Sequence, residues 1–290
     1  MPTWAPDARL RSRHVFADPP PTLPGVELLT QDLDDEAEFE AVKAQFHRAR
    51  ATHAYRRVFW AHEPLVSVCI TTADRSEILQ ARALKSVTEQ TYKNLQVIIV
   101  GDCCEADTIE RIATFRDPRF QYVNLPKRGP YPRPGYARWQ VAGTYPANAA
   151  LRLVRGPLVT HLDEDDAFEP RRIETLVKTL QETRSDLVFH QCNMEGEDRS
   201  WSVRGNGEFI QGQVGTGTVL YHHWLARIPW DLFAYRRGEP GDWNRFRKFK
   251  ALGARLHFVP ESLVDYYKYP LRDPFVAKPG EEFLDEGPGA

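Results

Sequence analysis

The chain has 290 residues, of which 42% are hydrophobic and 27% are charged, and its formal net charge is -2. This composition is typical of a globular protein with a buried core, and it lacks the basic excess of a nucleic-acid-binding protein. The longest apolar runs, such as residues 95–100, are too short to cross a bilayer, and the N-terminus has no signal-peptide core. We therefore expect a cytoplasmic protein with no integral membrane segment and no nucleic-acid partner.

The first 60 residues differ in pattern from the rest. Residues 1–25 are rich in Pro and Arg and have no periodicity, which predicts an arm with little regular structure. Residues 34–59 have helical spacing, with acidic side chains at the start and basic ones at the end. One stripe of this helix is apolar: Phe39, Val42, Phe46 and Ala49. The stripe packs on the main domain or on a second subunit, which leaves a homodimer open.

Strand-like and helix-like segments alternate from residue 65 to residue 162. We expect strands at 65–72, 95–100, 120–125 and 157–162, and helices at 77–90, 105–115 and 146–154. Such alternation is typical of right-handed crossovers on a mostly parallel sheet, so the fold class is α/β.

The later part of the chain is less regular. We expect a helix at 171–182, a strand at 187–194, short strands and loops around 201–225, and a helix at 242–253. The segments ARLHFVP and SLVDYYKY predict two further strand-plus-loop units. We divide the chain into an arm and helix (1–63), a main domain (64–270) and a mobile tail (271–290).

An acidic cluster, Asp163 to Asp166, comes directly after the strand predicted at 157–162. In an open α/β sheet, ligands bind beyond the carboxyl ends of the strands. If the chain stays extended, Asp163 and Asp165 point the same way and offer oxygen ligands to a divalent cation. That cation would offset the repulsion between the carboxylates. The alternative is that Asp165 or Asp166 caps the helix that follows.

Other acidic residues follow the same pattern. Asp74 comes after the first predicted strand, Asp102 follows the second, and Asp242 opens a late helix. This repetition favours a ligand site at one edge of the sheet, although Asp242 alone is also a good helix cap.

These segments resemble the inverting family-2 glycosyltransferases, which have a GT-A fold. The similar segments are LVSVCITTADRSEILQARALKSVTEQTYKNLQVIIVGD, RGPLVTHLDEDDAFEPRRIETL and GDWNRFRKFKALGARLHFVPESLVDYY. The resemblance covers about residues 64–268 and is nearest to the small spore-coat polysaccharide enzymes. It implies a Rossmann-like, mostly parallel central sheet with helices on both faces, preceded here by an N-terminal helical extension.

The resemblance also implies roles for individual residues. Asp165 would be the principal ligand of Mn²⁺ or Mg²⁺, and Asp163 would contact the ribose or assist the metal through water. Asp242 would be the general base. The other nucleotide-binding residues would be Thr71, Thr72, Asp74 and Asp102.

The chain departs from the family pattern in three places. Ala73 stands where an aromatic residue is usual, the second strand ends in Gly101-Asp102-Cys103-Cys104 rather than in two Asp followed by Gly-Ser, and Gly241 replaces a Glu before the base. UDP is the favoured carrier, with GDP and dTDP left open.

Two further regions are candidates for ligand contacts. The loop at 126–140 is rich in Arg, Tyr and Trp, so it is either a lid, with Arg138 on the diphosphate, or a solvated connection. Thr216, Gly217 and Trp243 would line the acceptor pocket, with core packing as the alternative.

We therefore expect a metal-dependent inverting glycosyltransferase, which moves a sugar from a nucleotide-sugar donor to a carbohydrate or small-molecule acceptor. One alternative is a nucleotidyltransferase that makes sugar nucleotides. The segment ITTADRSE counts against it, because it lacks the Gly-rich loop of that class. The other is a non-catalytic sugar-nucleotide-binding module.

Overall fold

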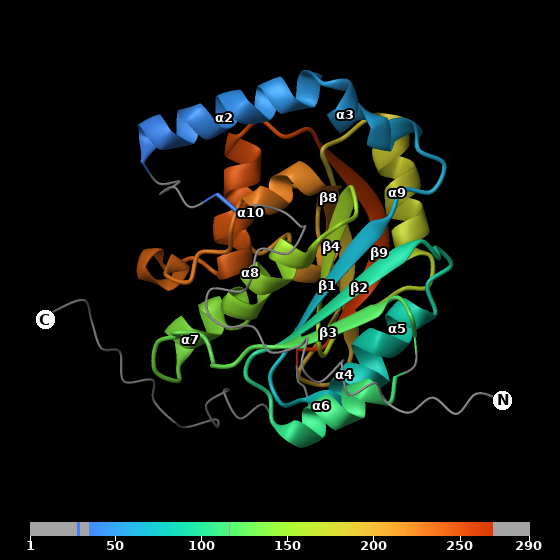
Figure 1. The fold of residues 1–290 in the computed structure, drawn as a ribbon, viewed down its shortest axis with the longest axis vertical. Coiled ribbons are helices and arrows are strands. Elements are labelled where there is room, and N and C mark those ends of the chain that lie inside the picture. The colour runs from blue at the N-terminus through green and yellow to red at the C-terminus, as the bar shows by residue number, and fades with distance from the viewer. Residues whose placement is uncertain (1–27, 30–34, 116, 269–290) are drawn as a thin grey trace, which may run out of the picture.

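The computed structural model describes residues 28–29, 35–115 and 117–268, and within them nine strands form one sheet (Figure 1). The predicted arm at 1–25 and tail at 271–290 lie outside the described residues. In the described part, no helix is both long and apolar enough to cross a membrane.

The sheet is mostly parallel, as the alternating pattern predicts. Its strands are β1 Val66–Thr72, β2 Leu95–Gly101, β3 Phe120–Asn124, β4 Leu158–Asp163, β5 Ala167–Phe168, β6 Leu187–Glu195, β7 Trp201–Arg204, β8 Val219–His222 and β9 Leu256–Tyr266. Their spatial order is β3-β2-β1-β4-β8-β6-β9-β5, with β7 beside β6. Strands β1 to β4 are parallel, β8 runs antiparallel between β4 and β6, and β9 is parallel to β6.

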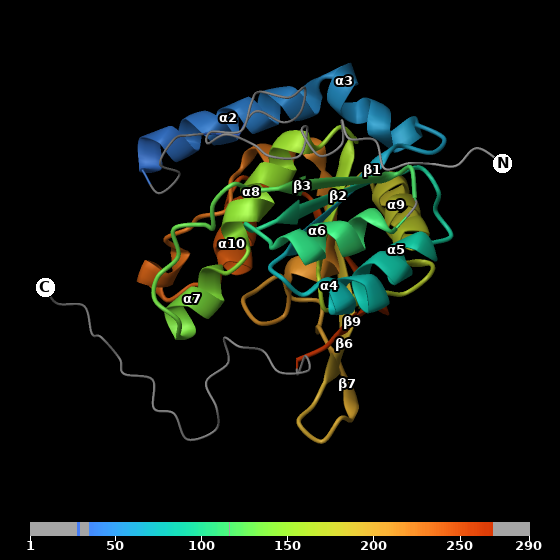
Figure 2. The same ribbon diagram turned by 60° about the horizontal axis from the view of Figure 1, so that its bottom comes forward.

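Helices cover both faces of this sheet. They are α2 Glu36–Ala51, α3 His53–Arg56, α4 Ser76–Leu79, α5 Lys85–Thr88, α6 Ala106–Ala113, α7 Tyr136–Val141, α8 Thr144–Leu153, α9 Arg172–Thr183 and α10 Gly241–Ala251. Shorter 3-10 turns are η1 Arg57–Trp60, η3 Thr216–Thr218, η4 His223–Arg227 and η5 Ala234–Arg237. In Figure 2 the strands β2 and β3 lie between α8 on one side and α4 and α6 on the other, which is the arrangement of a doubly wound sheet.

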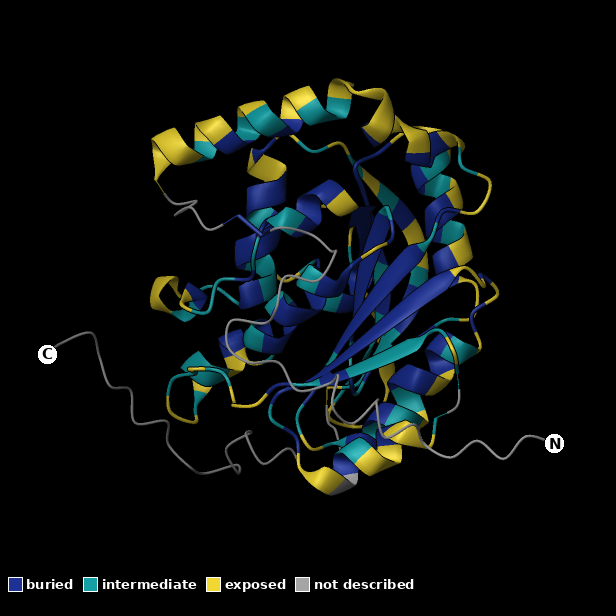
Figure 3. Ribbon diagram, viewed as in Figure 1, coloured by how far each residue is buried: buried dark blue, intermediate teal, exposed yellow. Residues whose placement is uncertain are grey.

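The predicted apolar strands form the centre of the core. All residues of β2 are buried, and only Thr71 of β1 is partly exposed (Figure 3). Burial on both faces is the reason that these strands are continuously apolar. The helix predicted at 77–90 is interrupted by a π-helical turn, Gln80–Leu84, between α4 and α5.

The predicted N-terminal helix is two helices rather than one. It breaks at Thr52, whose hydroxyl accepts a hydrogen bond from the Tyr55 N–H at 3.2 Å and so starts α3. On α2, Val42 and Phe46 are fully buried, and the Phe46 ring lies 4.9 Å from that of Trp224. The apolar stripe therefore packs on this chain's own domain and no longer argues for a dimer.

Two other predictions need correction. Helix α9 begins at Arg172 with Arg171 at its N-cap, so neither Asp165 nor Asp166 caps it. The segments ARLHFVP and SLVDYYKY form one long strand, β9, which absorbs the interruption through register shifts against β6.

Candidate active site

The candidate site lies where the strand order reverses. From β1 the chain moves outward to β2 and β3, and then returns to form β4 on the other side of β1. Thr71 of β1 pairs in register with Asp163 of β4, so these two side-chain positions meet at the carboxyl ends of their strands. This reversal point is where open α/β sheets bind ligands.

A cavity of about 480 Å³ opens at this point. It is lined by every predicted site residue except Asp74: Thr71, Thr72, Asp102, Arg138, Asp163, Asp165, Thr216, Gly217, Asp242 and Trp243. Residues that lie far apart in the sequence therefore share one pocket, of a size ordinary for a small-molecule site.

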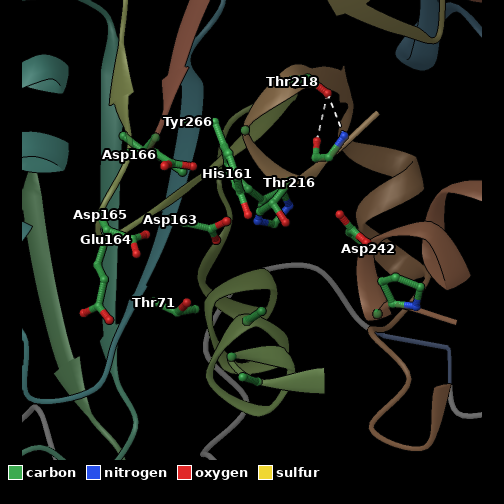
Figure 4. A pocket seen from close by; sticks show the side chains of 18 of the residues that line it. Thr71, His161, Asp163, Glu164, Asp165, Asp166, Thr216, Thr218, Asp242 and Tyr266 are labelled. Carbon is green, nitrogen blue, oxygen red and sulfur yellow. Dashed lines mark hydrogen bonds between the residues drawn. The ribbon is translucent and has the colours of Figure 1, made fainter. Parts of the chain in front are cut away.

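The acidic cluster is a turn rather than an extended segment. The Asp166 N–H donates to the Asp163 carbonyl oxygen at 3.2 Å, so the chain reverses immediately after β4. Figure 4 shows the Asp163 carboxylate pointing into the cavity, while the Glu164 side chain, which also lines the cavity, extends in another direction. Glu164 accepts hydrogen bonds from the Thr72 hydroxyl and from the Ala73 N–H, at 3.2 Å for the latter, and so ties the ends of β1 and β4 together.

Arg75 supplies part of the positive charge that the acidic turn requires. Its guanidinium lies 3.3 Å from Glu164 Oε1 and 3.0 Å from Asp165 Oδ2. The Arg82 guanidinium donates to the Asp165 carbonyl oxygen at 2.9 Å. The sequence prediction missed Arg75, although it lies in the same ITTADR segment as Thr71, because nothing local shows which carboxylate it meets.

This compensation is incomplete at Asp163. Burial, followed by the negative charges of Asp165 and Asp242, raises the pKa of Asp163 to about 8. Burial and the charges of Asp165 and Asp163 likewise hold the pKa of Asp166 well above its ordinary value. The protein partners of the turn therefore do not compensate for the ionisation of all its carboxyl groups.

The carboxylate oxygens of the turn are suitable ligands for a divalent cation that takes few ligands from the protein. Among residues 28–29, 35–115 and 117–268, no group of three or more His, Cys, Asp or Glu side chains is arranged to hold a metal ion. Mg²⁺ and Mn²⁺ need only one or two carboxylates when water and phosphate oxygens complete their shell. Asp163 and Asp165 match that requirement.

Asp242 faces the acidic turn from the other side of the cavity, in the first turn of α10 (Figure 4). Its Oδ1 accepts a hydrogen bond from the Trp243 N–H at 2.6 Å, and it lines the cavity. The N-cap of α10 is Pro240, so the alternative that Asp242 caps this helix is wrong. Burial raises its pKa to about 6, against the lowering effect of the N–H groups of Trp243, Asp242 and Thr216. The adjacent turn is closed by hydrogen bonds between Thr218 Oγ1 and the backbone of Gly215.

Asp102 and Asp74 both hold the loop that follows β3. Asp102 lines the cavity and its Oδ1 accepts a hydrogen bond from the Gly129 N–H at 3.0 Å. Asp74 accepts from Arg128 Nη2 and from the Glu105 N–H, both at 2.7 Å, and it is not among the cavity-lining residues. The structure thus separates Asp74 from the other predicted nucleotide-binding residues.

Tyr266 is a cavity residue that the sequence prediction missed. It stands at the end of β9, and the next residue, Tyr267, donates its N–H to Asp166 Oδ1 at 3.0 Å. Its position depends on the pairing of β9 with β6, which brings the segment DYY back to the acidic turn. No local motif in the sequence predicts that pairing.

The fold and the cavity define a glycosyltransferase of the GT-A class. The crystal structure of S. aureus TarS 1-349 has the same fold, with a TM-score of 0.55 over 70% of this chain and 60% of that chain, at 17% identity. The family model described as "Glycosyl transferase family 2" matches residues 67–132 and 145–238, which is more than half of the chain. The chain belongs to glycosyl transferase family 2.

Several curated relatives are named for the synthesis of a polysaccharide. Hyaluronan synthase of Pasteurella multocida is 24% identical over 226 residues, covering 72% of this chain and 22% of that protein. The succinoglycan biosynthesis protein ExoO of Rhizobium meliloti (strain 1021) is 31% identical over 118 residues, covering 40% of this chain and 29% of that protein. The chain spans less than half the length of the curated relatives it matches. The likeness to spore-coat enzymes stays a prediction.

Proposed function

We propose that this enzyme transfers a sugar, with inversion, from a nucleoside-diphosphate donor to an acceptor hydroxyl, in a reaction that depends on a divalent metal. The observation that carries the proposal is the placement of two sets of carboxylates across one cavity, Asp163 and Asp165 on one side and Asp242 on the other. UDP is the favoured carrier, since TarS, which shares the fold, was crystallised with UDP and with UDP-GlcNAc. The acceptor is a carbohydrate or a small molecule.

The acidic turn would help to stabilise the leaving group, the nucleoside diphosphate. Asp165, with Asp163 beside it, would hold Mn²⁺ or Mg²⁺, whose chemistry here is to neutralise the charge of the departing diphosphate. Thr71, Thr72 and Asp102 line the β1 and β2 side of the cavity, where we place the nucleotide. Arg138 lines the same cavity and would add positive charge near the phosphates.

Asp242 would act on the acceptor. A carboxylate with a pKa near 6 is largely ionised at neutral pH and is basic enough to take a proton from a hydroxyl as the new bond forms. Thr216, Gly217 and Trp243 line the cavity around it, where we place the acceptor sugar. Attack from this side, opposite the diphosphate, inverts the anomeric carbon.

A thermal-shift screen tests the donor half of the proposal. UDP-, GDP- and dTDP-sugars are compared with and without Mn²⁺, and we expect one nucleotide class, UDP first, to stabilise the protein only with the metal. At a hundred times its dissociation constant such a donor adds about 2.7 kcal/mol. The shift should vanish with a chelator and in Asp165→Ala, and persist in Asp198→Ala, whose side chain lies outside the cavity. If no donor stabilises the protein in the presence of metal, the proposal is wrong.

A further inference from the structure

Helix α7 lies in a part of the chain that the family model does not match. The two matched segments end at residue 132 and resume at residue 145, so the interval between them contains all of Tyr136–Val141. The cavity lining nevertheless includes Arg138, Trp139 and Gln140 of this helix. A segment outside the shared family pattern therefore forms part of the wall of the active site.

Two large aromatic rings on α7 are exposed at this wall. Tyr136 and Trp139 are 58% and 55% exposed, one helical turn apart, and their ring centroids are 5.5 Å apart with 21° between the ring planes. Trp139 also lines the cavity, so the pair continues the cavity wall outward. Side chains that combine an apolar ring with a polar edge suit a ligand of the same mixed character, and a sugar ring has such a character.

The helix is held at a defined position relative to the proposed base. The preceding loop is fastened by Gly129 to Asp102 and by Arg128 to Asp74. Beyond α7, the chain packs so closely on α10 that a Cβ at Gly241 would come within 2.7 Å of Thr144 Cγ2. The same Cβ would lie 3.4 Å from the carbonyl oxygen of Gln140 in α7. Gly241 immediately precedes Asp242, so α7 and the start of α8 both lie against the element that carries this carboxylate. These contacts favour a fixed platform over the lid that the loop sequence suggested as one possibility.

The size of the cavity limits how much of an acceptor it holds. A volume of about 480 Å³ is of the order of a single small-molecule site. If a nucleotide sugar and the terminal sugar of an acceptor share this cavity, the rest of an acceptor chain must extend out of it. Trp139 lines the cavity and is also exposed to solvent, and Tyr136 stacks on it, so both rings are accessible to a chain that extends out of the cavity.

We propose that Tyr136 and Trp139 are a saccharide-binding platform, which stacks on a sugar ring behind the acceptor's terminal sugar. The acceptor is then an oligosaccharide or polysaccharide chain rather than a single sugar or an unrelated small molecule. This inference rests on the proposed function, because it assumes that the acceptor hydroxyl meets Asp242.

A glycan array tests the platform. The full chain, with Mn²⁺ and the nucleotide selected by the thermal-shift screen, is applied to neutral and carboxylate-bearing saccharides from single sugars to hexasaccharides. We expect retention on chains of two or more sugars. Trp139→Ala and Tyr136→Ala should each weaken it on the order of tenfold, the effect of losing one aromatic contact, and Trp139→Phe should restore part of it.

Trp60→Ala is the matched control, because Trp60 is 58% exposed but does not line the cavity. It should bind the array as the wild type does. Retention of no oligosaccharide by the wild type, or equal binding by the Trp139→Ala and Trp60→Ala variants, would overturn the platform. Stabilisation of the wild type by a donor distinguishes the two proposals. If a donor stabilises the wild type but no oligosaccharide retains it, only the platform is wrong. If no donor stabilises the wild type, the proposed function itself is contradicted.

Discussion

Two aspartates at opposite ends of the sheet have opposite environments. Asp186 stands before β6, and its carboxylate accepts hydrogen bonds from the Tyr55 hydroxyl at 2.8 Å, Arg50 Nη1 at 3.0 Å and the Arg255 N–H at 2.8 Å. Asp163 stands at the end of β4 among other carboxylates. Since β4 and β6 run in the same direction, the start of one and the end of the other lie at opposite edges.

The pKa values record this difference. Burial raises the pKa of a carboxyl, yet at Asp186 the hydrogen bonds from Arg255 and Tyr55 outweigh burial and hold the pKa below its ordinary value. At Asp163 burial acts together with neighbouring negative charge, and the pKa rises. A carboxylate with enough hydrogen-bond donors and positive charges around it contributes to stability. A carboxylate that lacks them is typical of a ligand-binding site.

The largest effect expected on the cavity side of this comparison comes from Asp242→Asn. Loss of the general base should lower the transfer rate by about 10²- to 10⁴-fold and leave donor stabilisation unchanged. Steady-state transfer and thermal shift are measured on the same samples, with Asp231→Asn, which lies outside the cavity, as the control. Because the pKa of Asp242 is raised to about 6, wild-type transfer should fall as the pH drops through about 6. Transfer by the variant at the wild-type rate would remove Asp242 from its role.

Asp186→Ala tests the other end of the sheet. Removing this carboxylate leaves the buried Tyr55 hydroxyl and the Arg255 N–H without their acceptor and takes the ion-pair partner from Arg50, so the free energy of unfolding should fall by about 3 kcal/mol. Its folded pKa is lowered, so its contribution is present above the ordinary value near 4 and is lost as the pH falls through the folded value. Urea unfolding at several pH values measures this difference. Asp231 is more exposed than Asp186, so Asp231→Ala, which removes its ion pair with Arg237, should cost under about 1 kcal/mol. Equal losses in the two variants would contradict the comparison.

Asp163→Asn should change stability in the opposite direction. The folded pKa of Asp163 lies above its ordinary value of 3.8, so ionisation destabilises the fold as the pH rises from about 4 to about 8. In a chelator, the variant should therefore be more stable than the wild type at pH 8, by an amount that shrinks as the pH falls, and equal to it near pH 4. Urea unfolding provides the measurement. A variant less stable than the wild type at pH 8 would show that protein partners already compensate for the charge of Asp163.

The local sequence pattern predicted the half of the sheet in which strands and helices alternate along the chain. Strands β1 to β4 and helices α6 and α8 lie within a residue or two of their predicted bounds, because each combines an apolar run with the period of its element. Three features were not predicted: the break at Thr52, the π-helical turn at Gln80–Leu84, and the formation of one strand, β9, from two predicted units. Each depends on contacts with distant elements, which local propensity does not encode.

The same distinction holds at the cavity. Asp163, Asp165 and Asp242 were found because each follows or opens an element in a recognisable segment. Arg75 and Tyr266 were missed because their roles depend on which side chain lies opposite them. The turn at Glu164 also replaced the extended geometry expected for Asp163 and Asp165, although both carboxylates still line the cavity.

Tyr55 and Arg50 belong to the segment before residue 64, yet they hold Asp186 in the core of the family-2 domain. Phe46 packs in the same core, against Trp224. A fragment that began at residue 64 would keep the whole cavity and lose part of the shell around Asp186. Cooperative unfolding should therefore include helices α2 and α3, and the minimal expression fragment of this enzyme must start before them.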